Sequence, residues 1–158
     1  MRFQDGVVRI TQKALDDVCR AALAIPAEKQ DWSPGGDARS ALNQMQEIAV
    51  AATWFLNVMQ DLRVPREPER SIDETMERAR QLKTIEECVE MARSTTSELC
   101  RAIAAFPPEA LEVEATLPFG EGQTVSMADV LYLHAWNLTY HLGQLNQIQL
   151  MLGDREMH

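Results

Sequence analysis

Basic residues are scarce in this chain. Its 158 residues include 15 lysines and arginines against 24 aspartates and glutamates, which leaves a formal net charge of −9 at pH 7. A protein that binds nucleic acid needs a surface rich in lysine and arginine, because the phosphate backbone repels an acidic protein. The same repulsion acts at a membrane surface of anionic lipids. The charge balance therefore predicts that the chain has neither a nucleic-acid partner nor a membrane partner.

Long apolar runs are also missing, and so is the layout of a signal peptide. No stretch supplies the roughly 20 consecutive apolar residues that a membrane-spanning helix needs. The first residues, MRFQDGVVRI, lack the basic-then-apolar order of a secretory signal. We expect one domain, residues 1–158, located in the cytoplasm and long enough to form its own hydrophobic core.

Cysteine is rare, and its spacing carries no motif. The three cysteines are Cys19, Cys88 and Cys100, and no two of them form a Cys-x-x-Cys pair. Their number is odd, and each falls inside a helical pattern. Disulfide frameworks belong to small oxidised domains, so these residues are expected to be reduced thiols in the core of a cytosolic protein.

Apolar residues recur with a helical period in most of the chain, which predicts an all-α fold. Asp37 is the expected N-cap of the second helix, and Ser71 with Glu74 and Thr84 with Glu87 form capping boxes. The prolines and charges of 63–70 indicate a surface crossing, and the loose alternation after Leu111 indicates a small β-hairpin or extended arm before the last helix. We therefore expect a four-helix bundle with long crossings. The expected helices are residues 7–25, 38–61, 71–82, 84–105 and 126–153.

The last of these helices carries a polar stripe on an otherwise apolar sequence, and this composition predicts that most of the helix is buried. It opens with a capping box, Ser126 and Asp129, and ends at Gly153, which can take the left-handed conformation that stops a helix. Between them, polar residues recur at spacings of three and four, which places them along one side of the helix. They are His134, Asn137, His141 and Gln144. A buried polar stripe is costly unless something satisfies it, so this stripe marks the candidate site.

Geometry limits which of these residues can act together. His134 and His141 are seven residues apart, which is about 10 Å of helical rise. Metal–ligand bonds are about 2 Å long, so the two rings cannot easily share one ion. Asn137 and His141 are four residues apart and can converge on one point. A third ligand would have to come from another helix.

The second helix offers a candidate for that third ligand. Arg39, Asn43 and Glu47 follow one another at four-residue steps, and the same line then turns apolar. Glu47 lies between apolar neighbours in the middle of the helix, although an exposed surface glutamate explains the pattern equally well. Sites in helix bundles are built from side chains on facing helices, where Glu47 could meet Asn137 and His141.

Two segments of the chain resemble the DinB/YfiT-like family. DWSPGGDARSALNQMQEIA resembles the entry to the second helix of that family, and YHLGQLNQIQLMLGD resembles its last helix, with the His-x-Gly-Gln motif at residues 141–144. The resemblance covers essentially the whole chain. It implies a four-helix bundle, commonly a homodimer, in which many members hold a divalent metal through three histidines. Some relatives are transferases or isomerases that use a low-molecular-weight thiol such as mycothiol or bacillithiol.

The resemblance places the metal ligands at Glu47, Asn137 and His141. His141 matches the last histidine of the family, whereas Asn137 and Glu47 stand where the family has its other two. It leaves Asn43, His134 and Gln144 as outer residues of the site or its pocket. A carboxylate and an amide are harder ligands than imidazole, and the amide oxygen is a weak donor. We therefore expect a weakly held or absent ion, with preference moved from zinc towards manganese, iron or nickel.

Three interpretations remain open at this point. In the first, the chain is a metal-dependent transferase or hydrolase that acts on small molecules such as thiol adducts, in a homodimer. It could instead be a non-catalytic, ligand-binding or stress-related homodimer that keeps the pocket with little or no metal. In the third interpretation the Glu/Asn/His set is a hydrogen-bonded network that holds two helices in register.

Overall fold

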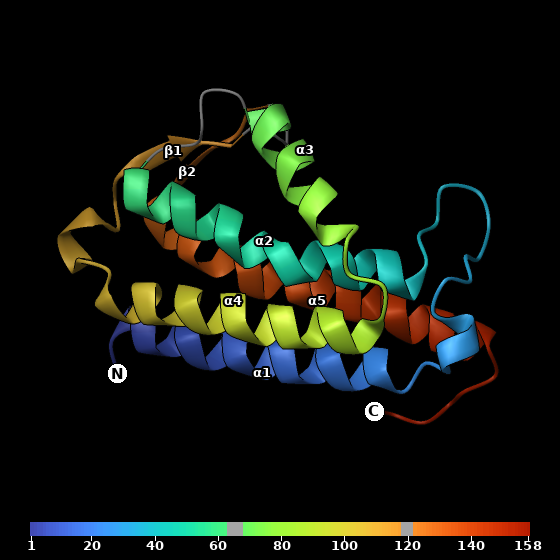
Figure 1. Ribbon diagram of the computed structural model, residues 1–158. Coiled ribbons are helices and arrows are strands. Elements are labelled where there is room, and N and C mark those ends of the chain that lie inside the picture. The colour runs from blue at the N-terminus through green and yellow to red at the C-terminus, as the bar shows by residue number, and fades with distance from the viewer. Residues whose placement is uncertain (63–67, 118–121) are drawn as a thin grey trace.

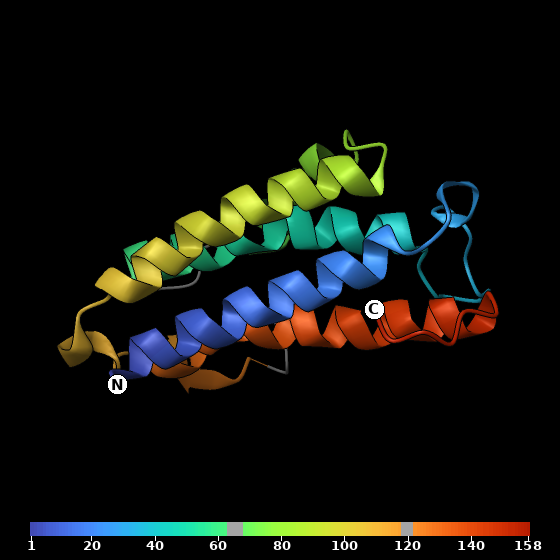
Figure 2. The ribbon, with the colours of Figure 1, turned by 90° about the horizontal axis from the view of Figure 1, so that it is seen from below.

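Four long helices lie side by side and form the body of the molecule (Figure 1). The computed structural model describes residues 1–62, 68–117 and 122–158, and for residues 68–72 it describes the backbone alone. The long helices are α1 (Phe3–Leu23), α2 (Ala41–Asp61), α4 (Ile85–Ala105) and α5 (Met127–Met151). Seen from below, α2 and α4 form one layer, and α1 and α5 form the other (Figure 2). The expected all-α four-helix bundle is confirmed.

Helix α2 shares its long sides with both α4 and α5, while α1 packs against the same two helices from the opposite corner. The short helix α3 (Pro68–Ala79) packs on α2 from outside the bundle. This arrangement places residues of α2 and α5, which are about 90 positions apart in sequence, face to face. Helix α3 lies beside the outer side of the groove between α2 and α5.

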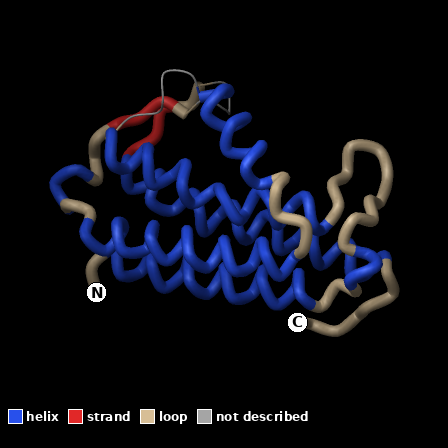
Figure 3. The backbone as a smooth tube through the Cα atoms, in the orientation of Figure 1, coloured by secondary structure: helices blue, strands red, loops and turns tan. Residues whose placement is uncertain are grey.

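A two-stranded hairpin precedes the last helix, as the sequence predicts (Figure 3). Strand β1 (Glu114–Thr116) pairs antiparallel with β2 (Thr124–Ser126), and Ala115 stands opposite Val125. Ala115 is buried against the bundle, which ties the hairpin to the start of α5. Two single-turn 3-10 helices, Ala27–Lys29 and Pro108–Ala110, lie in the other connections.

The core is made of aliphatic and small side chains on the inner faces of the four long helices. Its fully buried members include Val18, Met45, Ile48, Leu99, Leu138 and Leu145. The three cysteines are buried thiols, as expected, and burial raises the pKa of Cys19 to about 11 and that of Cys88 to about 12. None of the described helices is both long and apolar enough to cross a membrane.

One expectation about the core is wrong. The apolar composition of α5 suggested that most of it is buried, but five of its large apolar side chains are exposed. They are Tyr132, Trp136, Tyr140, Leu150 and Met151. They recur at helical spacing on the outward side of α5, because a helix at the surface of a four-helix bundle buries only the sides that face its neighbours.

Two helices, α4 and α5, begin at the capping boxes that the sequence predicts. Thr84 and Glu87 cap α4, and Ser126 and Asp129 cap α5, each through reciprocal side-chain to backbone hydrogen bonds. Gly153 adopts φ of +91° just after α5, and the Asp154 N–H donates to the Gln149 carbonyl oxygen, which closes the helix end.

Three helix starts differ from the expectation. α1 begins at Phe3 instead of residue 7, because Arg2 and Asp5 close a cap there. α2 is capped by Ser40 and not by Asp37, since the turn in which the Ala38 N–H donates to the Gly35 carbonyl keeps Asp37 in the loop. α3 begins at Pro68, so Ser71 lies inside the helix. Proline is well suited to a first helical position, where its missing N–H has no partner to lose. The rest of the expected crossing, residues 63–67, lies outside the described residues.

Replacing Ser126 by alanine is expected to lower the free energy of unfolding by about 1 kcal/mol. The Ser126 hydroxyl oxygen accepts from the Asp129 N–H at 3.2 Å, and the Asp129 carboxylate accepts from the Ser126 N–H at 3.0 Å. The measurement is urea unfolding followed by circular dichroism. Ser97→Ala is the matched control, because Ser97 is exposed and lies in the middle of α4, away from its caps. This substitution should change the free energy of unfolding by no more than about 0.5 kcal/mol. Equal effects of the two substitutions would contradict this role of the cap.

Candidate functional site

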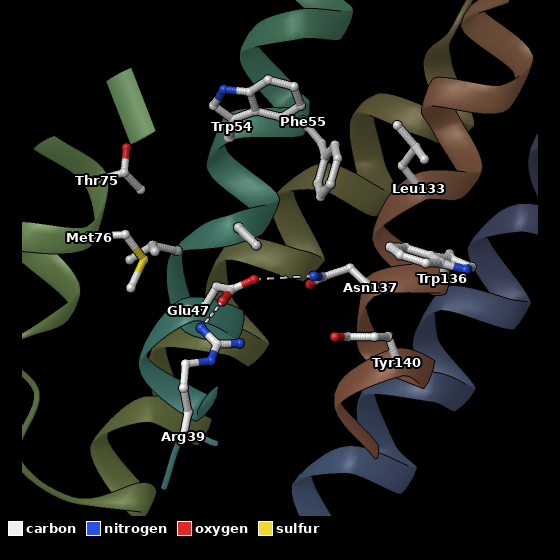
Figure 4. A pocket seen from close by; sticks show the side chains of 12 residues that line it. Arg39, Glu47, Trp54, Phe55, Thr75, Met76, Leu133, Trp136, Asn137 and Tyr140 are labelled. Carbon is white, nitrogen blue, oxygen red and sulfur yellow. Dashed lines mark hydrogen bonds and ion pairs between the residues drawn. The ribbon is translucent and has the colours of Figure 1, made fainter. Parts of the chain in front are cut away.

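The fold brings Glu47 of α2 next to Asn137 and His141 of α5. Glu47 Oε1 lies 3.1 Å from His141 Nε2 and 3.4 Å from Asn137 Nδ2. Figure 4 shows the contact between Glu47 and Asn137 across the two helices. The Glu47 side chain is 30 % exposed and His141 is fully buried, so Glu47 is not the freely solvated surface glutamate of the alternative interpretation. The three residues that the family resemblance named as metal ligands lie together in the structure.

Gln44, which the sequence interpretation did not single out, sets the orientation of the His141 ring. The Gln44 amide nitrogen donates to the Arg39 carbonyl oxygen at 3.3 Å, so its oxygen Oε1 faces His141 Nδ1, also at 3.3 Å. An amide oxygen accepts only, which assigns the ring proton to Nδ1. Gln44 lies three residues before Glu47 in α2, and that helical spacing was the signal that could have identified it.

This tautomer directs His141 Nε2 at a carboxylate oxygen. A bare lone pair on Nε2 would face Glu47 Oε1 at 3.1 Å, which is repulsive. A proton or a metal ion between the two atoms removes that repulsion. A histidine whose second ring nitrogen is fixed by an outer hydrogen bond is the common arrangement of metal-binding imidazoles.

Arg39 is a second residue of the site that sequence reasoning did not assign to it. Its guanidinium pairs with Glu47 Oε2, while Glu47 Oε1 faces His141 and Asn137. Burial by itself would raise the pKa of Glu47, but the hydrogen bonds from His141 and Arg39 outweigh it and lower that pKa to about 2. Glu47 is therefore an anion at neutral pH.

Asn137 supplies an unused acceptor. Its Oδ1 atom is buried, and within the described part of the chain it has no hydrogen-bond partner. A buried acceptor left without a partner costs about 1–3 kcal/mol, so such an atom often marks a place that a ligand or ion fills. A half-turn of the Asn137 amide exchanges its nitrogen and oxygen. The oxygen would then lie on the side of Glu47 Oε1 and His141, where it could bind the same ion as they do.

The donor set fits a divalent ion. Two atoms bound to one ion at about 2.1 Å lie roughly 3.0–3.4 Å apart in octahedral or tetrahedral geometry. The observed separations from Glu47 Oε1 are 3.1 Å to His141 Nε2 and 3.4 Å to the Asn137 amide. No three His, Cys, Asp or Glu side chains gather anywhere in the described residues, so a metal site here depends on the amide.

The outer residues named from the sequence lie in three different places. His134 is fully buried away from Glu47, with Nε2 at 2.9 Å from Thr96 Oγ1 and its ring 5.7 Å from the ring of Phe55. Asn43 is half-buried, and its backbone N–H donates to the hydroxyl oxygen of Ser40, the N-cap of α2. Gln144 lines a second pocket, beyond Arg39, together with Gln44. Burial lowers the pKa of His134 to about 3, so this ring is neutral.

A pocket of about 540 Å³ opens onto Glu47 and Asn137 between α2, α3 and α5 (Figure 4). Its walls are mainly apolar and aromatic, and its polar groups gather around Glu47. Trp136 and Tyr140 stack on each other with ring centroids 5.5 Å apart, and both are about half exposed (55 % and 52 %). These exposed aromatic side chains of α5 therefore line the pocket. The apolar lining includes Val50, Trp54, Phe55, Met76, Leu133 and Trp136, and the polar lining Arg39, Glu47, Asn137 and Tyr140.

The sequence matches the model of the DinB superfamily over residues 10–145. The chain belongs to the DinB superfamily. This match covers the first of the two segments whose resemblance was noted from the sequence and the second as far as Leu145, and it includes Glu47, Asn137 and His141. No curated protein matches the chain.

Solved structures with the same fold support the assignment at low sequence identity. YfiT from Bacillus subtilis, described as a probable metal-dependent hydrolase with an unusual four-helix-bundle topology, has a TM-score of 0.75 at 8 % identity, over 96 % of this chain and 88 % of that one. The DinB-like protein YjoA from Bacillus subtilis has a TM-score of 0.69 at 17 % identity, over 97 % and 95 % of the two chains. A mycothiol-dependent maleylpyruvate isomerase has a TM-score of 0.71 at 14 % identity, and the match covers 92 % of this chain but 63 % of that enzyme.

Proposed function

We propose that this DinB superfamily member is a divalent-metal-dependent enzyme acting on small molecules, as a hydrolase or a thiol-dependent transferase. Glu47, Asn137 and His141 hold the ion between α2 and α5. One observation carries the proposal: Gln44 fixes the proton on His141 Nδ1, so Nε2 faces a Glu47 oxygen at 3.1 Å, an arrangement that a bound metal ion would stabilise. The family likeness and the description of YfiT as a probable metal-dependent hydrolase support it.

The protein side of this chemistry follows from the contacts. The bound ion would lower the pKa of a water molecule or thiol and so supply a nucleophile at neutral pH. Gln44 orients His141, Arg39 holds the second oxygen of Glu47, and the aromatic walls provide an apolar surface beside these groups. The described lining of the pocket contains no cysteine or serine, which favours a water molecule or the thiol of a co-substrate as the nucleophile. A low-molecular-weight thiol fits this requirement.

The ion is expected to be manganese, iron or nickel more readily than zinc, and to be weakly held. One carboxylate, one imidazole and one amide oxygen form a harder and weaker set than three imidazoles. The positive charge of Arg39 on Glu47 lowers the affinity further, because it competes for the same carboxylate.

The direct test is elemental analysis of the purified, untagged protein, followed by calorimetric titration of manganese, nickel and zinc into wild type and Glu47→Ala. We expect one ion per chain in wild type and a loss of at least about tenfold in affinity in the variant. Glu87→Ala, a surface carboxylate of the α4 cap, is the control and should bind like wild type. Failure of all three ions to bind wild type would reject the metal-dependent enzyme.

The second candidate is a non-catalytic, ligand-binding or stress-related accessory protein. The Arg39–Glu47–His141–Gln44 chain of contacts favours it, because these groups can satisfy one another without an ion once His141 is protonated on both nitrogens. In this case the pocket binds a small molecule and performs no chemistry. A protein that binds ligand but no metal would support this candidate over the enzyme.

Assembly and location complete the proposal. We place the protein in the cytoplasm, which suits three buried free thiols, and we propose a homodimer on the family likeness. The exposed apolar side chains of α5 that do not line this pocket, Tyr132, Leu150 and Met151, are consistent with a covered surface. Light scattering at micromolar concentration should give twice the chain mass of 17.8 kDa, and a monomeric mass would reject the dimer.

A further inference from the structure

The charged groups of the pocket gather at one end of it. Among the described lining residues, Arg39 and Glu47 are the only two that carry charge, and they pair with each other. The opposite wall is apolar, with Trp54, Phe55 and Leu133 facing the cavity in Figure 4. A ligand of this pocket therefore has an apolar body and meets polar groups at one end only.

Arg39 keeps most of its hydrogen-bonding capacity unused. A guanidinium has five N–H donors. Within the described residues, the side chain of Arg39 makes one contact, from Nη1 to Glu47 Oε2, and it remains 36 % exposed. The remaining donors border the pocket, since Arg39 lines it. They can bind a further acceptor without breaking the pair with Glu47.

Tyr140 supplies another donor from the opposite helix. Its ring stacks on Trp136 and meets the His141 ring edge-on at 5.4 Å, but its hydroxyl has no hydrogen bond within the described chain. Figure 4 shows the hydroxyl directed from α5 towards α2, on the side of the pocket where Glu47 and Arg39 lie. The unused groups of Arg39 and Tyr140 at this end of the pocket can donate hydrogen bonds, while the unused acceptor there, Asn137 Oδ1, belongs to a proposed ligand of the ion. Donors from two sides suit an oxygen-bearing acceptor.

The charge balance favours an anionic acceptor. The charges of Arg39 and Glu47 cancel, Asn137 is neutral, and a divalent ion on Glu47 would leave the end of the pocket positive. An anion on the ligand neutralises this surplus in a partly desolvated site, where charge pairs are stronger than in water. The surplus that a bound ion would leave here contrasts with the net charge of −9 on the whole chain.

From these contacts we infer that the substrate is an organic acid with an apolar, preferably aromatic, body. Its carboxylate is bound by Arg39 and Tyr140, and its body lies against Trp54, Phe55, Leu133 and Trp136. The cavity of about 540 Å³ has room for a two-ring compound. The inference builds on the proposed function, because the bound acid would lie beside Glu47 and Asn137, the proposed ligands of the ion.

The test compares an acid with its neutral counterpart. 2-Naphthoate and 2-naphthamide are titrated into the full-length protein, with binding followed by calorimetry and by the fluorescence of the pocket tryptophans. We expect wild type to bind the acid at least about tenfold more tightly than the amide. In Arg39→Gln this ratio should fall below about threefold, through weaker binding of the acid alone. Tyr140→Phe should lower it by a smaller factor.

Arg93→Gln is the matched control, because Arg93 pairs with Asp16 at the surface between α1 and α4, away from this pocket. It should bind both compounds like wild type, and thermal unfolding checks that each variant is folded. Equal affinity of wild type for acid and amide, absence of binding, or equal loss of both in Arg39→Gln would overturn the inference.

Each titration is done with chelator-treated protein and again with saturating manganese. Selective binding of the acid in both states supports the inference, and stronger selectivity with manganese supports it further. Manganese binding without selective binding of the acid would reject the inference and leave the proposed function standing. Selective binding of the acid by a protein that takes up no metal would reject the proposed enzyme and leave the inference standing on Arg39 and Tyr140.

Discussion

Replacing His141 by alanine is expected to abolish metal binding, with a loss of at least about 100-fold in affinity. His141 supplies the only imidazole of the proposed set, and its Nε2 lies 3.1 Å from Glu47 Oε1. Changes in residues that merely orient a ligand cost about 10–100-fold in affinity, so removal of the ligand itself should cost more. The loss is measured by calorimetric titration of manganese or nickel and by elemental analysis of the purified variant.

Gln44→Leu separates the orienting role from the ligand role. This variant keeps His141 but removes the oxygen that fixes the proton on Nδ1, and we expect a loss of about 10-fold in affinity. Gln46→Leu is a useful control, because Gln46 lies two residues away and its amide donates to the Leu82 carbonyl oxygen, not to the site. If the His141→Ala variant binds metal as tightly as wild type, the ion is bound at another place and the proposed ligand set is wrong.

Acidification is expected to destabilise the fold through His134, by about 2 kcal/mol between pH 7 and pH 5. His134 is fully buried, and burial lowers the pKa of its ring from the ordinary value of 6.5 to about 3. Its Nδ1 atom has no hydrogen-bond partner among the described residues, so a second ring proton would be buried without an acceptor. Below pH 6.5 the unfolded chain binds a proton that the folded chain does not. The stabilisation is therefore complete above pH 6.5 and is lost as the pH falls towards 3.

The contribution of His134 is isolated by a double variant, Thr96→Val with His134→Leu. His134 Nε2 and Thr96 Oγ1 are 2.9 Å apart and buried, so replacing both avoids leaving either one without its partner. Urea unfolding of both proteins at pH 7, 6 and 5 should show a shallower loss of stability in the double variant. Parallel pH profiles would mean that His134 is protonated in the folded state or is open to water.

The helices and their main caps could be predicted from the sequence because their signals are local. Thr84 with Glu87 and Ser126 with Asp129 each satisfy one another within four residues, so these two helix starts depend little on distant parts of the chain. Asp37 was a different case, because it and Ser40 are both good capping residues. The loop that includes Gly35, at φ of +108°, decided between them, and a local pattern does not contain that information.

Part of the candidate site was also determined by the sequence alone. Helical geometry requires Asn137 and His141 to share a face of α5 and keeps His134 apart from His141, and the structure has both features. The polar line through Glu47 in α2 similarly follows from its spacing. These statements hold for a helix in any surroundings, because the rise and the turn per residue do not depend on packing.

Only the tertiary structure decided which groups act on one another between helices. Gln44 and Glu47 reach His141 because α2 packs against α5 in one register, and a shift of one residue would have placed different side chains there. Packing likewise left Trp136 and Tyr140 on the outward side of α5, where α3 and α2 complete a pocket around them. The sequence determined the faces of the helices, since periodicity is a property of a single segment. The pairing of faces depends on how all the buried side chains fill the same core, and that is decided only when the whole chain folds.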